Sequence, residues 1–399
     1  MKEAIYATDI RDSTSGERNQ LGQPFTTTVV GSFSRSRELI EATKKHANGE
    51  LTKAELDAQL ERATESTIKG EEEAGLDVIT DGEQRRSSFV SFVGDKIPGF
   101  EVMHITQLNP RAMEILKENK VQLTYTRAVI TGQIRDAVIA RGEFEAARKY
   151  SKKPFKVTLP APYLVMWESW HNIHSKEAYP TPEDFGHAYA KLLRNEVARL
   201  KEAGVSFIQL DEPMLGDLTE AGDKPDRYRR VFHELYGQEY RGFKEELRLA
   251  VDLLNEVTRG VTGVRVGVHM DRWPNKDSPY FDQGYERFLP ELLETKTNQF
   301  VLEYSTPGTG DPAKLVKQFP KDLEIGLGVI SVQNYEVETP EQVVERTRRI
   351  IGKIEPERIW LNPDCGFAPG MYRAFPREVA FAKLKSMTTA AKQLRKEYA

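Results

Sequence analysis

The sequence is poor in the features that mark secreted, membrane and nucleic-acid-binding proteins. A single cysteine, Cys365, excludes a framework of internal disulfides. No apolar run approaches the ~18 residues that a membrane-spanning helix requires, and the N-terminus has neither the basic nor the apolar region of a signal peptide. Charges of both signs are interspersed and the net charge is only -4, so neither nucleic acid nor an anionic membrane is an expected partner. We therefore expect a cytoplasmic protein.

Short β-branched runs alternate with amphipathic helical patterns, which is typical of βα units on a parallel sheet. Eight runs are strand candidates, at residues 26–32, 76–80, 156–159, 205–210, 264–269, 299–303, 323–327 and 358–361. The glycine-rich fingerprint of dinucleotide-binding sheets does not follow the first of them. The pattern therefore predicts an α/β fold, a single (β/α)8 TIM barrel rather than an open doubly wound sheet.

The same pattern predicts the domain organisation. Residues 1–23 are polar and lack a hydrophobic period, which indicates a flexible N-terminal arm. Residues 24–399 form the predicted catalytic barrel, which a helix at about 376–396 closes. Residues 90–153, between the second and third strands, predict an inserted subdomain over one side of the barrel mouth, with a hairpin at 121–134 and then a basic helix.

Polar residues follow nearly every predicted strand, at the end where such barrels build their active sites. They are Ser32, Asp81, Glu83, Asp211, Glu212, His269, Asp271, Glu303, Asp364 and Cys365. Four of them supply an imidazole, two carboxylates and a thiolate, which can complete a four-coordinate zinc site: His269, Asp271, Glu303 and Cys365. His269 and Asp271 lie two residues apart, so an extended strand turns both to the same side.

Each of the four residues also has an ordinary structural interpretation. A buried cysteine is usually a small apolar core residue, a histidine at a strand end can bond a neighbouring carbonyl, and a glutamate can be half of an ion pair. Taken singly, these interpretations are favoured. Together, four metal-competent groups at the ends of the fifth, sixth and eighth strands favour a shared metal site.

Six blocks of the sequence resemble the cobalamin-independent methionine synthase family. They are TTTVVGSF, ITDGEQRR, FIQLDEP, GVH-x-D, VLEYS and WLNPDCGF, and they span nearly the whole chain from Thr26. The order of IQLDEP and LNPDCG is the most specific part of the match. The chain resembles the C-terminal catalytic barrel of these enzymes, or the short single-barrel members of the family.

The resemblance implies roles for particular residues. The family's zinc ligands fall on His269, Asp271, Glu303 and Cys365, with Asp271 where the family has a cysteine. Its homocysteine-binding residues fall on Val30, Gly31, Ser32, Glu83 and Asp211. The carboxylates of Glu83 and Asp211 would hold the amino group, and Ser32 with neighbouring backbone N–H groups would hold the carboxylate. An aromatic contact to the methyl donor would fall on Trp167 or Trp170, for which ordinary helix packing is an equal alternative.

The implied reaction is transfer of a methyl group from methyl-folate or a methyl-corrinoid to the thiol of homocysteine, forming methionine. A zinc-bound thiol ionises near neutral pH, and the thiolate is the form that attacks carbon. Two departures from the family affect this expectation. Asp271 is a harder ligand than cysteine, so iron, manganese or cobalt competes better with zinc. The family's catalytic histidine after the seventh strand is matched most nearly by Gln333, which cannot carry a proton.

Other functions remain open at this stage. The same metal site could serve another thiol alkyl transfer, a lyase reaction, or a non-haem iron oxidation with His269, Asp271 and Glu303 as a facial triad. A degenerate barrel that binds a thiol or a corrinoid without turnover is a further alternative. The expected partners are a small-molecule thiol and a methyl donor, with a corrinoid protein as one candidate donor.

Overall fold

The computed structural model describes residues 21–119, 126–216, 218, 227–271, 284–306, 308–368 and 375–398. Within these residues, seven strands form one parallel sheet in the order β1-β9-β8-β7-β6-β5-β4. The strands are β1 (Thr26–Thr27), β4 (Lys156–Pro160), β5 (Phe207–Asp211), β6 (Arg265–Met270), β7 (Gln299–Leu302), β8 (Glu324–Ile330) and β9 (Ile359–Pro363). The α/β class and the parallel sheet are as predicted, and the predicted N-terminal arm lies outside the described residues except for 21–23.

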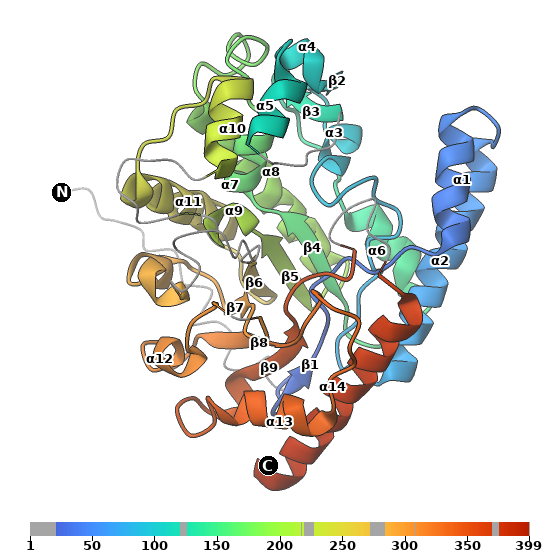
Figure 1. Ribbon diagram of the computed structural model, residues 1–399, viewed down its shortest axis with the longest axis vertical. Coiled ribbons are helices and arrows are strands. Elements are labelled where there is room, and N and C mark those ends of the chain that lie inside the picture. The colour runs from blue at the N-terminus through green and yellow to red at the C-terminus, as the bar shows by residue number, and fades with distance from the viewer. Residues whose placement is uncertain are drawn as a thin grey trace.

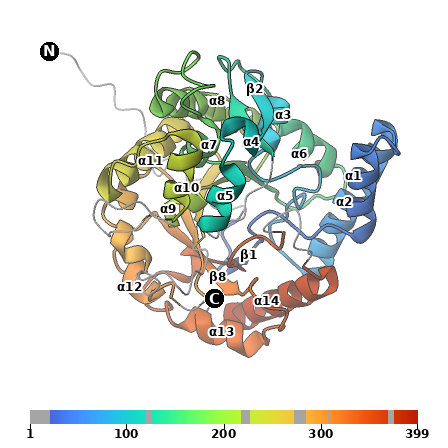
Figure 2. The ribbon, with the colours of Figure 1, turned by 45° about the horizontal axis from the view of Figure 1, so that its top comes forward.

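The helices lie around the strands (Figures 1 and 2). They are α1 (Arg37–Ala47), α2 (Lys53–Ala74), α3 (Phe92–Lys96), α4 (Ile105–Leu108), α5 (Ala112–Glu118), α6 (Arg141–Arg148), α7 (Pro162–Ser169), α8 (Pro182–Glu202), α9 (Pro213–Gly216), α10 (Arg227–Tyr236), α11 (Phe243–Thr258), α12 (Pro312–Val316), α13 (Pro340–Arg348) and α14 (Arg377–Tyr398), with 3-10 turns at Tyr285–Phe288, Glu291–Glu294 and Pro356–Arg358. None of the described helices is long and apolar enough to cross a membrane.

Local sequence signals explain where the long helices begin and end. Helix α2 starts with a capping box in which Thr52 and Glu55 exchange side-chain to backbone hydrogen bonds, and it ends at Gly75 with φ of 89°.

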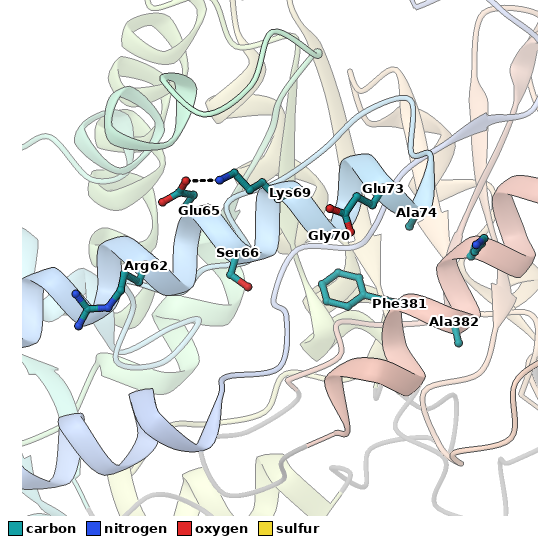
Figure 3. A pocket seen from close by; sticks show the side chains of 10 residues that line it. Arg62, Glu65, Ser66, Lys69, Gly70, Glu73, Ala74, Phe381 and Ala382 are labelled. Carbon is teal, nitrogen blue, oxygen red and sulfur yellow. Dashed lines mark hydrogen bonds and ion pairs between the residues drawn. The ribbon is translucent and has the colours of Figure 1, made fainter.

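Helix α14 packs beside α2, where Gly70 leaves room for the ring of Phe381: an added Cβ would lie 2.2 Å from that ring (Figure 3). A surface hollow of about 640 Å³ lies between these helices, and none of the predicted site residues lines it.

The second predicted strand, residues 76–80, is not a regular strand. The backbone N–H of Val78 donates to Thr27 of β1 at 3.1 Å, while Ile79 donates to Pro154 at 3.0 Å and accepts from Lys156 at 2.8 Å. The segment therefore bonds to both edge strands of the sheet. The first strand is also shorter than predicted, because the carbonyls of Val29 and Val30 accept side-chain hydrogen bonds from other strands instead of continuing a ladder.

The predicted hairpin at 121–134 is wrong. Residues 120–125 lie outside the described part of the chain, and β3 (Thr126–Ile130) pairs antiparallel with β2 (Phe100–His104), about two dozen residues upstream. The observed strand β3 lies where the predicted hairpin would turn, and a local sequence pattern carries no information about the partner of a strand. The strands β2 and β3 and helices α4 and α5 lie beside α7 and α10 (Figure 1), and the predicted basic helix is observed as α6.

The apolar core has two parts. A large cluster lies between the sheet and the helices. A smaller one lies on the other face of the sheet and consists of Val30, Val78, Phe207, Val301 and Trp360. Val78 comes from the irregular segment, and the last three come from β5, β7 and β9. The inner face of the curled sheet is thus filled by side chains rather than open, with polar groups above this layer.

Candidate metal and substrate site

His269 lies near the end of β6 and is buried. Its Nδ1–H donates to the carbonyl of Val301 at 3.0 Å, while Nε2 has no hydrogen-bond partner among the described residues. Burial lowers the pKa of His269, an effect that the Asp271 carboxylate opposes. A neutral imidazole that donates through Nδ1 keeps the Nε2 lone pair available, which is the usual state of a metal-binding histidine.

Asp271 and Cys365 lie next to this free nitrogen. The Sγ of Cys365 is 3.3 Å from Oδ2 of Asp271, and one ligand atom from each of His269, Asp271 and Cys365 lies within 4.8 Å of the others. Burial raises the pKa of the Cys365 thiol well above its usual value, and the carboxylates of Asp271 and Glu303 raise it further. Such a thiol needs a nearby cation to ionise at neutral pH.

Glu303 follows β7 and is buried, with its backbone N–H donating to Tyr285 Oη at 3.3 Å. Its charge acts on Cys365, so the two side chains are neighbours. Its carboxylate is nevertheless outside the group of atoms within 4.8 Å of one another. Three of the four predicted ligands thus meet, and Glu303 lies at the side of the cluster.

Asp364 is a buried carboxylate near these residues that accepts several hydrogen bonds. It accepts hydrogen bonds from the backbone N–H groups of Tyr304 and Ser305, at 3.0 and 2.9 Å, and from the hydroxyls of Ser305 and Thr306. It therefore joins the turn after Glu303 to the turn that carries Cys365. The sequence places Asp364 at a predicted strand end, but only the fold shows which turns it connects.

Glu83 has a strained backbone, with φ of 54°. Its Oε1 accepts a hydrogen bond of 2.6 Å from Thr158 of β4, and Arg86 lies 3.7 Å away. Gly31 lies directly against the same oxygen, since a Cβ on that residue would be 2.7 Å from it. The Nε of Arg86 in turn donates to Glu143 of α6 at 2.9 Å. Arg86 therefore links Glu83 to α6, which lies in the segment between β1 and β4.

Asp211 ends β5 and accepts a hydrogen bond of 2.7 Å from Gln209. Burial raises its pKa to about 8, and the neighbouring charge of Glu83 adds to the shift. Two carboxylates are therefore held close together, and none of the described residues places a cation in direct contact with Asp211. An arrangement of this kind favours binding of a positively charged ligand group.

The segment that follows β1 lies beside the turn that carries Cys365. Ser32 Oγ would be 2.1 Å from a Cβ on Gly366, and the carbonyl of Ser32 accepts a hydrogen bond of 2.9 Å from Phe367. Val30 and Gly31 are buried, while Ser32 is partly exposed. The predicted substrate residues that follow β1 thus adjoin both Glu83 and the metal-competent cluster.

Two predicted residues have different surroundings. Trp167 is only 1% exposed, and its indole packs against Tyr163, Phe232 and Arg229. This packing favours the alternative in which Trp167 stabilises α7, so we leave it out of the substrate site. Gln333 is exposed in the turn after β8, where its backbone N–H donates to Ser331 Oγ. No described contact joins it to the cluster.

The family model described as "Cobalamin-independent synthase, Catalytic domain" matches residues 25–231 and 285–393. The chain belongs to this family. The matched residues include Glu83, Asp211, Glu303 and Cys365, whereas His269 and Asp271 fall in the gap between the two matched parts.

Named relatives agree with this assignment. The chain is 28% identical over 372 residues to a methionine synthase of Sulfurisphaera tokodaii, with 93% of each chain covered. It is 29% identical over 374 residues to one of Saccharolobus islandicus, covering 93% of this chain and 95% of the relative. Among solved structures, a B12-independent methionine synthase from Shewanella sp. W3-18-1 superposes with a TM-score of 0.71 at 20% identity, covering 94% and 98% of the chains. One from Listeria monocytogenes, described as putative, gives 0.65 at 20% identity, with 93% and 98% covered.

Proposed function

We propose that this protein transfers a methyl group from a small-molecule donor to the thiol of homocysteine and so forms methionine. Family membership and the relatives named methionine synthase support the reaction. The observation that carries the proposal is the convergence of His269, Asp271 and Cys365 within 4.8 Å. A site for the sulfur is then available close to two carboxylates that suit an amino group.

We also propose that the sheet is a complete (β/α)8 barrel. Hydrogen bonds from residues 78 and 79 to both edges of the seven-stranded sheet support closure. The inner layer supports it as well, because Val78, Phe207, Val301 and Trp360 come from alternate strands of the expected barrel. Residues 24–399 would then form one catalytic domain, with 90–153 as an insertion and 1–23 as an arm.

The residues present fit a divalent metal. The free Nε2 of His269 has the right tautomer for a ligand, and a carboxylate and a thiol lie beside it. A bound metal of this kind would supply a positive charge that keeps a sulfur atom ionised near neutral pH. We propose zinc, with Glu303 as a further ligand, and iron, manganese or cobalt as competitors because Asp271 is a hard ligand.

The other groups of the site would recognise the amino acid part of homocysteine. The ammonium group would bind between Glu83 and Asp211, and its charge would restore the ionised state of Asp211. The carboxylate would bind at Val30, Gly31 and Ser32, in the segment after β1, where backbone groups become available. Gln333 would contribute only hydrogen bonding, because a side-chain amide acts as neither a general acid nor a general base at neutral pH.

The alternative functions are less well supported. An iron facial triad would need Glu303 rather than Cys365 beside His269 and Asp271, whereas Cys365 is the third member of the cluster in the described residues. The comparisons give no support to a corrinoid partner, since the matching family is described as cobalamin-independent.

The test is a methyl-transfer assay with homocysteine and either methyl-folate or methylcobalamin. We expect methionine with the folate donor, together with about one zinc per chain in anaerobically purified protein. Asp211→Asn should retain the metal and raise the KM for homocysteine, while Cys365→Ser should lose the metal. Stoichiometric iron with oxygen-dependent turnover, or no methionine from either donor, would overturn the proposal.

A further inference from the structure

Two buried polar side chains lie inside the sheet beneath the substrate residues. Lys156 of β4 and Gln209 of β5 are 1% and 0% exposed. The Nζ of Lys156 donates to Gln209 Oε1 at 2.8 Å and to the carbonyl of Val29. The Nε2 of Gln209 donates to Asp211 Oδ1 at 2.7 Å and to the carbonyl of Val30 at 2.9 Å. The two side chains therefore link β4, β5 and the segment that follows β1.

The amide of Gln209 is held in one orientation. An ammonium group only donates, so Lys156 requires the oxygen of the amide on its side. The acceptors Asp211 and Val30 O require the NH2 group on the other side. Rotating the amide by 180° would place oxygen against oxygen at Asp211 and Val30, and buried polar groups without partners are costly. Gln209 thus presents a fixed pair of donors to the substrate residues.

Among its described contacts, Lys156 has no carboxylate within hydrogen-bonding distance. Burial lowers the pKa of its amine to about 7. The charges of Asp211, Glu71 and Glu83 oppose this lowering. A buried amine that lies over the ring of Phe207 and lacks a carboxylate partner among its described contacts is unfavourable for folding alone. A role in positioning the polar groups above it would explain why a lysine occupies this place.

We propose that Lys156 and Gln209 are positioning residues for homocysteine recognition. Gln209 sets the direction of the Asp211 carboxylate and fixes the segment after β1 at Val30, and Lys156 acts through Gln209. The same layer holds the other carboxylate, because Thr158, the partner of Gln209 in the β4–β5 register, donates to Glu83. This inference rests on the proposed function, in which Asp211 binds the amino group.

The test compares homocysteine with 4-mercaptobutyrate, which is homocysteine without its amino group. Gln209→Leu should raise the KM for homocysteine roughly tenfold to a hundredfold, the factor expected when a hydrogen bond to a charged group is lost. Turnover of 4-mercaptobutyrate, the KM for the methyl donor and the metal content should stay unchanged. Lys156→Met should give a smaller loss of the same kind, since Val30 and Asp211 still orient the amide.

A matched control lies in the same layer of the sheet. Gln299 of β7 is in register with Gly267, which is in register with Gln209, and it is equally buried but donates to Glu324 instead of a site residue. Gln299→Leu should leave the preference for homocysteine over 4-mercaptobutyrate intact. The double variant of Lys156 and Gln209 should be no worse than Gln209→Leu alone, because the two act in series.

The outcomes separate this inference from the proposed function. If the unmodified protein neither binds nor methylates homocysteine, the proposed function fails and the inference fails with it. If the unmodified protein is active and Gln209→Leu keeps its preference for homocysteine, only the inference is overturned. If Gln209→Leu does not fold, Lys156→Met decides: an unchanged homocysteine KM overturns the inference, and a selective rise supports it.

Discussion

Asp364 should control how tightly the protein holds its metal, although it is not one of the predicted ligands. It is fully buried and accepts four hydrogen bonds from the turn at Tyr304, Ser305 and Thr306. Asp364 joins the turn that follows Glu303 to the turn that carries Cys365. Removing these bonds releases both turns at once, so both ligand positions lose their support.

The size of the effect follows from the number of bonds. Hydrogen bonds to a charged group contribute roughly 1.5–3 kcal/mol each, and breaking up a buried charged network costs about 3–5 kcal/mol. Asp364→Asn keeps an oxygen for the two backbone donors and loses the charge, so we expect a loss of about 2 kcal/mol in the free energy of unfolding. Asp364→Ala removes all four acceptor contacts and should cost about 4 kcal/mol. Metal affinity should fall about tenfold to a hundredfold in each variant.

The assay is chelator competition for zinc, with urea unfolding of the metal-free protein measured in parallel. A matched control is Asp184→Ala, which breaks the capping box at the start of α8 and should cost about 1 kcal/mol of stability without changing metal affinity. Asp364→Ala with unchanged zinc affinity would refute the argument, because Glu303 and Cys365 would then be held independently of this carboxylate.

Three further changes test other parts of the structure. Cys365→Ser should lose most of the metal and remain folded, as metal analysis and circular dichroism would show; retained metal with retained activity would remove Cys365 from the site. Asp271→Cys should increase the preference for zinc over manganese at least tenfold in competition assays, because a thiolate is the softer ligand. Burial raises the pKa of Glu71 to about 8, so between pH 4.5 and 8 the folded chain holds a proton that the unfolded chain releases, and stability falls as pH rises. Glu71→Gln should therefore gain stability over the unmodified protein by up to about 1.4 kcal/mol per pH unit across this window in urea titrations, and two parallel pH profiles would contradict this.

The regular part of the sheet could be predicted closely from the sequence. The strands from β4 to β9 begin and end within one to three residues of the predicted runs, because each is a β-branched stretch between polar turns. The first two predicted strands were less accurate. Their backbone groups bond to side chains and to single residues of distant strands, and no local pattern records such bonds.

The metal-competent cluster was predictable in part. Strand ends of a parallel sheet meet at one edge, so His269, Asp271, Glu303 and Cys365 were expected to converge. Ligand atoms of His269, Asp271 and Cys365 lie within 4.8 Å of one another, and Glu303 lies outside this group. The positioning groups were not expected. Lys156 and Gln209 lie within apolar runs, where a polar residue carries no sign of which way it faces. Asp364 was visible as a polar strand end, but its partners come from a turn 60 residues away.

The two halves of the site are held by separate sets of contacts. The carboxylates that suit an amino group are fixed from β4 and β5, where Thr158 bonds Glu83 and Gln209 bonds Asp211. The metal-competent residues lie at or just after the ends of β6, β7 and β9. Asp364 joins the turn after β7 to the turn after β9. Since no described hydrogen bond links one set of side chains to the other, changes around β4 should impair homocysteine recognition while metal remains bound. Changes around Asp364 should release metal while Asp211 keeps its position. The site thus owes its shape to the curled sheet that holds both sets, and we expect that each set can be weakened alone.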